Sequence, residues 1–196
     1  IVTGLIVDFG YVIYLPKESA SMPTDVNKLV SKALTIKFFL AFIALIILLL
    51  GHGLGFVVGE LKLLLPFCIS AIFVSIGTTF LLPYRSLNRF QVESKYLMIQ
   101  HISLSILAIL VVLFIPDIFM LSLVYLTVRF IYCLLAYNNF RQEFNFSWVI
   151  ETDILSEIKK VAPYATHAVI ATMLVQIDTL ILANYVDSAQ IGIYQA

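Results

Sequence analysis

Residues 38–50 read FFLAFIALIILLL, thirteen consecutive residues without a charge. Apolar and polar side chains do not alternate in this run, as they would in a strand of a membrane β-barrel. A helix that crosses a bilayer needs about 20 mostly apolar residues. A helix is expected because, apart from a closed barrel, it is the form in which all backbone hydrogen bonds are satisfied in lipid. Extended on both sides, the run predicts a membrane-spanning helix over about residues 34–58.

The composition of the whole chain indicates the same class of protein. Of its 196 residues, 61% are hydrophobic and 12% are charged, where a soluble domain usually has about 25% charged residues. The net charge is zero and the mean hydropathy is +1.01. These values exclude a disordered chain, and a nucleic-acid partner would require an excess of basic residues. We therefore predict an all-α, polytopic membrane helix bundle surrounded by membrane lipids.

Six segments qualify or nearly qualify as transmembrane helices: residues 1–16, 34–58, 63–84, 96–115, 118–137 and 161–186. Residues 24–34 and 153–161 have amphipathic patterns, typical either of short helices on the membrane surface or of extensions of the next span. The chain begins inside an apolar stretch without an initiator methionine, so we expect it to be an internal part of a longer protein.

The basic residues are sorted between alternate loops. Loops 17–37, 85–95 and 141–160 together hold ten of the twelve, which are Lys17, Lys28, Lys32, Lys37, Arg85, Arg89, Lys95, Arg141, Lys159 and Lys160. Of the other loops, one holds Lys62 and the other holds none, and Arg129 lies within a span. By the positive-inside rule, the three basic loops are predicted to be cytoplasmic.

Arg129 is the first candidate for a functional residue, because a charged side chain inside a span usually faces the bundle interior or a water-filled cavity. At about 100° per residue, Ser122, Tyr125 and Tyr132 fall on the same helix face. A guanidinium on such a polar stripe suits a phosphate or a carboxylate, since its fork offers paired donors. The alternative is an arginine that extends to the inner interface or pairs with an acidic residue.

Asp8, His167 and Asp178 are the other intramembrane candidates, and His101 is a weaker one. Asp8 is expected at about mid-depth, where its carboxylate either balances Arg129 or binds a coupling cation. His167 and Asp178 share a helix face about 16 Å apart, which allows both to line one pathway. Histidine as a residue type can exchange protons near neutral pH, so His167 is a candidate for proton coupling, and a histidine hydrogen-bonded between helices is the alternative.

The chain shows no pattern typical of an enzyme. Cys68 and Cys133 are isolated within spans, and the sequence holds no nucleophile motif, no metal-ligand spacing and no long loop that could house an active site. The expectation is therefore a protein that is not an enzyme and has no metal or cofactor.

Three stretches resemble bacterial polysaccharide flippases of the O-antigen type, within the superfamily of multidrug and oligosaccharidyl-lipid/polysaccharide exporters. The stretches are DFG and KESA at residues 8–10 and 17–20, LPYRSLNRF at residues 82–90, and IKKVAPY, QIDTLIL and IGIYQA at residues 158–164, 176–182 and 191–196. They resemble the family's D-[FL]-G with its basic-Glu-x-Ala sequence, its turn before a basic loop, and its P-x(n)-I-D-x-x-[IL]-L with [IV]-G-x-Y-x-A.

The resemblance implies helices two to seven of a transporter with twelve to fourteen helices. Residues 1–160 would belong to the N-terminal lobe, and residues 161–196 would begin the C-terminal lobe. Such proteins flip a lipid-linked oligosaccharide of the polyprenyl pyrophosphate type across the bacterial cytoplasmic membrane by alternating access. Arg129 would then meet the anionic head group, and Asp8 and Asp178 would serve ion coupling or helix contacts. The alternatives are an ion-coupled exporter of drugs or small molecules and, less favoured, a membrane polysaccharide polymerase or acyltransferase.

Overall fold

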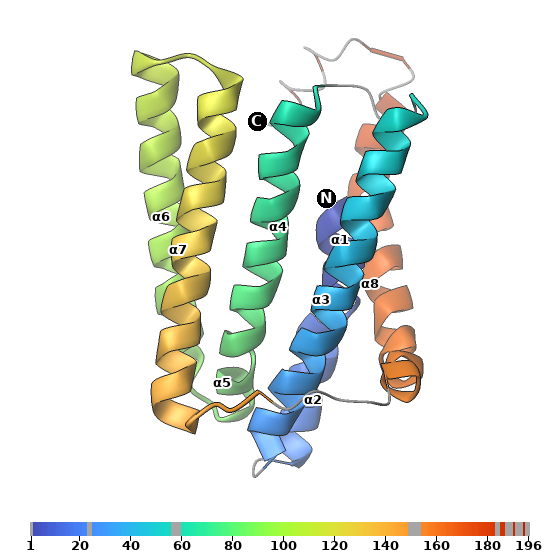
Figure 1. The fold of residues 1–196 in the computed structure, drawn as a ribbon, viewed down its shortest axis with the longest axis vertical. Helices are drawn as coiled ribbons and strands as arrows, with labels where there is room; N and C mark the ends of the chain where they lie inside the picture. Colours follow the sequence, from blue (N-terminus) through green and yellow to red (C-terminus); the bar gives the residue numbers. More distant parts are fainter. Residues whose placement is uncertain are drawn as a thin grey trace.

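The chain forms a bundle of helices that run along a common direction (Figure 1). The computed structural model describes residues 2–22, 25–55, 60–148, 154–182, 185–186, 190 and 194, without the side chains of residues 2, 154, 176 and 178–180. All regular secondary structure in these ranges is helical. The helices are α1 (Val2–Asp8), α2 (Tyr11–Ser21), α3 (Val26–Gly53), α4 (Leu61–Leu81), α5 (Pro83–Ser86), α6 (Phe90–Phe114), α7 (Ile118–Phe144) and α8 (Ile154–Leu182).

Within the described ranges, four helical segments are long and apolar enough to cross a membrane, which indicates a membrane protein: α3, α4 with α5, α6 and α7. Six spans were expected, and the two that differ are the first and the last. The first expected span is divided into α1 and α2, of 7 and 11 residues, and neither can cross about 30 Å of hydrocarbon. The last expected span, residues 161–186, falls in α8 (Ile154–Leu182), and part of it lies outside the described residues.

The bundle exposes many large apolar side chains, and beside its apolar core it buries several polar ones. In α3, Phe42 and Leu50 are 64% and 60% exposed, whereas Ala33, Ala41 and Ala44 are buried. The small residues let neighbouring helices approach, as is common within membranes. The two buried residues of α6, Glu93 and Gln100, are both polar, so the rest of this helix presents its apolar surface outward. An apolar exterior around an interior that also holds buried polar side chains fits lipid surroundings.

The two segments with amphipathic patterns are extensions of longer helices. Residues 26–34 are continuous with the rest of α3, and residues 154–161 are continuous with the rest of α8. The described part of each segment is therefore an extension of the next helix and not a separate helix on the membrane surface.

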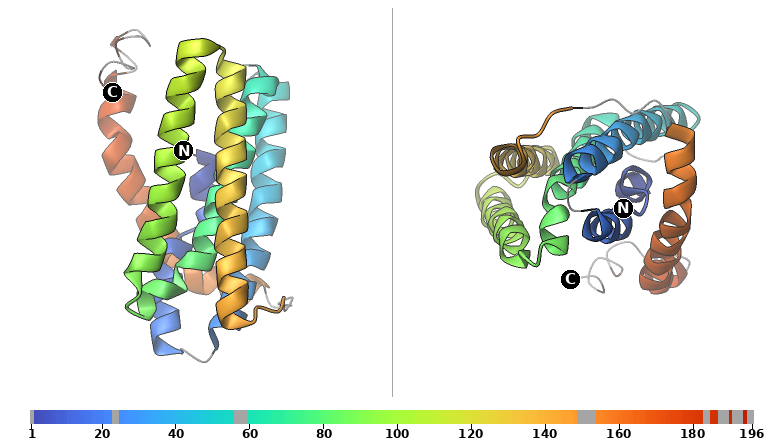
Figure 2. Two further views of the ribbon diagram at one scale, coloured as in Figure 1. Left: turned by 90° about the vertical axis from the view of Figure 1, so that its left-hand side faces the viewer. Right: turned by 90° about the horizontal axis from the view of Figure 1, so that it is seen from below.

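Helices α1 and α2 lie inside the arrangement, between α3, α4 and α8 (Figure 2). On the other side of α4, α7 packs closely against it, and α6 packs against α7. Gly77 of α4 makes this close packing possible, because a Cβ atom at this position would lie 2.7 Å from the ring of Tyr132. Helix α4 therefore forms one wall shared by the inner helices and by α7.

Candidate functional site

The break between α1 and α2 places Asp8 at the end of a short helix inside the bundle. Phe9 and Gly10 both have left-handed backbone conformations, with φ of 45° and 77°. A Cβ atom at Gly10 would lie 2.5 Å from the carbonyl carbon of Tyr164 and 2.5 Å from the backbone nitrogen of Ala165. Position 10 therefore requires glycine for two reasons, which are its left-handed backbone conformation and the close approach of α8.

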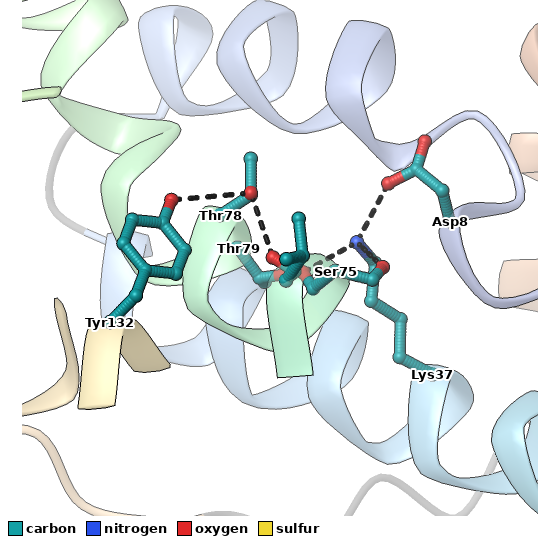
Figure 3. Close-up of polar contacts among 7 residues, drawn as sticks. Asp8, Lys37, Ser75, Thr78, Thr79 and Tyr132 are labelled. Carbon is teal, nitrogen blue, oxygen red and sulfur yellow. Dashed lines mark hydrogen bonds and ion pairs between the residues drawn. The ribbon is translucent and has the colours of Figure 1, made fainter. Parts of the chain in front are cut away.

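Asp8 forms an ion pair with Lys37 of α3. The Nζ atom of Lys37 lies 2.8 Å from Oδ1 of Asp8, and it also donates to the carbonyl oxygen and the hydroxyl of Ser75 at 3.2 and 3.0 Å (Figure 3). These three oxygens match the three N–H donors of an ammonium group. The side chain of Lys37 is 0% exposed and that of Asp8 is 21% exposed.

This pair corrects the prediction that Lys37 belongs to a cytoplasmic loop. The residue lies within α3 and is fully buried, so it is not a solvated loop residue. The prediction was wrong because counting loop charges treats each lysine as solvated. Here a carboxylate from another helix and two oxygens of α4 replace water around the ammonium.

Asp8 also lines a cavity of about 380 Å³ between α1–α2, α4 and α7. Its lining residues are Gly4, Asp8, Val12, Ala71, Val74, Ser75, Thr78 and Arg129. The cavity therefore has an acidic residue on one wall, a basic residue on another, and the hydroxyl residues of α4 between them. This cavity is the candidate binding site, and two of the residues predicted from the sequence, Asp8 and Arg129, line it.

Arg129 lies near the middle of α7 and is half-buried. Its Nη1 atom donates to the Ser70 hydroxyl at 3.1 Å, and its Cζ atom lies 5.1 Å from the centre of the Tyr125 ring. The Nε atom is buried and has no hydrogen-bond partner among the described residues. Across the described ranges Arg129 forms no ion pair, so Asp8 balances Lys37 rather than the guanidinium.

The other members of the predicted stripe lie on the side of α7 that packs on α4, in different roles. Tyr125 packs under Arg129 and against Phe67, with ring centres 5.4 Å apart in the latter pair. The Tyr132 hydroxyl lies 3.3 Å from that of Thr78, which lines the cavity. Ser122 is buried and donates to the carbonyl oxygen of Phe119 in its own helix, so its hydroxyl is already used.

Of the two candidates in α8, only His167 has a described side chain. His167 is exposed on α8 and is not one of the lining residues. The side chain of Asp178 lies outside the described residues. His101 is exposed on α6. In the ranges that the structure describes, no three His, Cys, Asp or Glu side chains come together as metal ligands.

A second polar network joins the helix ends that carry most of the basic residues. The Tyr84 hydroxyl donates to Glu143 at 3.0 Å and accepts from Asn139 at 2.7 Å, and Glu143 also pairs with Arg89. Across the bundle, Tyr14 of α2 donates to Glu157 of α8 at 3.2 Å. These contacts hold α7 to the turn around α5 and hold α2 to α8.

Sequence reasoning missed Lys37, Ser75 and Thr78 as parts of the site. Lys37 lies beside the apolar run 38–50, and this position was the available signal that it is not a surface residue. Serine and threonine are common in membrane helices, so Ser75 and Thr78 carry no signal of their own.

The fold and this cavity define an α-helical membrane protein with charged side chains held inside its bundle. No protein-family model, curated protein or solved structure matches the chain.

Proposed function

We propose that the chain is part of a membrane transporter that flips a lipid-linked oligosaccharide across the bacterial cytoplasmic membrane by alternating access. The observation that carries this proposal is Arg129, a guanidinium at a cavity wall whose buried Nε finds no hydrogen-bond partner in the described part of the chain. Arginine binds phosphate groups through paired donors. The pyrophosphate between lipid and sugar supplies such an anion.

The helices fit this proposal if α1 and α2 together cross the membrane as one broken span and α8 crosses as the sixth. Discontinuous helices are common at the substrate and ion sites of transporters, because irregular backbone is tolerated where it lines a cavity. In the proposed orientation, the ends that carry Arg85, Arg141 and Lys160 face the cytoplasm, in keeping with the positive-inside rule.

A second candidate function is an ion-coupled exporter of drugs or other small molecules. One observation favours it, which is that the carboxylate residue Asp8 lines the same cavity as Arg129. An exporter of organic cations needs an acidic cavity, however, and the carboxylate of Asp8 is already paired with Lys37. The unpaired guanidinium therefore favours the anionic cargo.

Complementation tests the proposal, with the full-length gene expressed in a strain that lacks its own flippase. We expect surface polysaccharide to be restored by the unmodified protein. Arg129→Ala should reduce export about tenfold or more, since a hydrogen bond to a charged group contributes about 1.5–3 kcal/mol. Arg129→Lys should restore part of the export, because it keeps the charge and loses the fork.

Arg141→Ala is the matched control, because Arg141 is an exposed arginine near the end of the same helix. It should leave export unchanged, and immunoblots should show equal amounts of all variants in the membrane. Normal export by Arg129→Ala would contradict the proposed role of the guanidinium. Restored drug efflux without restored polysaccharide would favour the small-molecule exporter.

A further inference from the structure

The ammonium group of Lys37 is held like a bound ion. It reaches the interior from α3 and meets three oxygens of different kinds, which are a carboxylate of Asp8, a backbone carbonyl and a hydroxyl of Ser75 (Figure 3). We propose that Asp8 and Ser75 form a binding site for a small monovalent cation, and that the ammonium group of Lys37 occupies this site in the unmodified protein.

The donor set supports this assignment. Carboxylate, carbonyl and hydroxyl oxygens are the hard ligands that Na⁺ and similar cations select, and here all three lie 2.8–3.2 Å from one point. The carbonyl is also fixed in direction, because it accepts from the Thr79 hydroxyl at 2.8 Å. An ion pair alone needs one carboxylate, whereas this site adds two oxygens from a third helix.

The site is open to a dissolved ion from one side. Asp8 and Ser75 line the cavity of about 380 Å³, whereas Lys37 does not line it and approaches from behind. Removal of the ammonium would leave the Asp8 carboxylate unpaired in a partly buried position, which is strongly unfavourable. A cation entering through the cavity would restore the charge balance.

The charge balance at this site depends on Asp8 and Lys37. The Tyr11 ring of α2 faces the ammonium with its centre 5.7 Å from Nζ, and it adds an attraction for any cation there. Arg129 of α7 lies on another wall of the cavity and forms no ion pair with Asp8. A cation that replaces the ammonium therefore meets the same carboxylate, hydroxyl and ring.

The test measures cation binding to the purified full-length protein in detergent micelles, without any assay of transport. Thermal unfolding of Lys37→Ala is followed in NaCl, methylammonium chloride and choline chloride at equal ionic strength. We expect NaCl or methylammonium to raise the Tm of this variant saturably, by about 5 °C or more relative to choline, which is too large for the site. The unmodified protein should show the same Tm in all three salts.

Two variants serve as controls. Asp8→Asn/Lys37→Ala removes the carboxylate as well and should lose the cation dependence. Lys62→Ala removes an exposed lysine at the start of α4 and should behave like the unmodified protein. Equal Tm values of Lys37→Ala in all three salts would overturn the proposal. The proposal would also be overturned if folded Lys37→Ala protein could not be purified in any of the three salts, because a cation at high concentration should replace the ammonium. Since only binding is measured, a failed complementation leaves this result unaffected.

Discussion

Gly10→Ala is predicted to weaken the packing of the α1–α2 break against α8. Alanine in the left-handed conformation costs about 1–2 kcal/mol. The added Cβ atom would lie 2.5 Å from backbone atoms of Tyr164 and Ala165, where carbon atoms normally keep about 3.5–4 Å. Helix α8 would then have to move by about 1 Å, and overpacking of this kind costs about 1–3 kcal/mol. The expected loss is about 2–5 kcal/mol of the free energy of unfolding.

Denaturant titration of the full-length protein in detergent micelles, followed by circular dichroism, measures this loss. Gly4→Ala is the matched control, because a Cβ atom at Gly4 of α1 meets nothing within 4 Å. It should be neutral or stabilising by up to about 1 kcal/mol, as expected for Gly→Ala in a helix. Gly10→Asn separates the two causes, since asparagine tolerates the left-handed conformation but brings the same Cβ atom. The reasoning is refuted if Gly10→Ala and Gly4→Ala unfold within about 0.5 kcal/mol of each other.

Two further predictions use the same titration. Lys37→Met should cost about 3–5 kcal/mol, because it leaves the carboxylate of Asp8 without its partner, and adding Asp8→Asn should recover most of that loss. Equal stability of the single and double variants would show that the pair contributes no coupling energy. Tyr84→Phe should cost about 1–3 kcal/mol, since it removes the hydroxyl that joins Glu143 and Asn139. An unchanged free energy of unfolding would mean that this network does not hold α7 to α5.

The apolar runs were sufficient to predict the long helices. Helix α7 begins at the predicted residue, Ile118, because Asp117 caps it by accepting from the backbone N–H of Phe119 at 2.9 Å. The helical period also predicted that Tyr125 and Arg129 share a face, and their side chains are in contact. These features depend on neighbours in the sequence, which is the information that hydropathy and periodicity contain.

The break at residues 9–10 and the burial of Lys37 depend instead on contacts between distant segments. Hydropathy contains no information on the backbone angles of Phe9 and Gly10. Position 10 requires glycine because the backbone of α8, more than 150 residues later in the sequence, lies against it. Likewise, the partners of Lys37 lie on α1 and α4. A lysine at the edge of an apolar run fits the membrane surface equally well until those partners are known.

The charges around the cavity bear on the kind of cargo. Among the described residues at this site, Asp8 and Lys37 cancel each other and the charge of Arg129 remains. An uncompensated positive charge within a membrane is costly, and such charges usually mark a pathway for a substrate or an ion. An anionic cargo would offset that cost when it binds, whereas a cationic cargo would add to it. In the proposed export, the two charged residues of the cavity would therefore have unequal roles. Loss of the Arg129 guanidinium would remove the attraction for an anion, and loss of the Asp8 carboxylate alone would leave two cations in place.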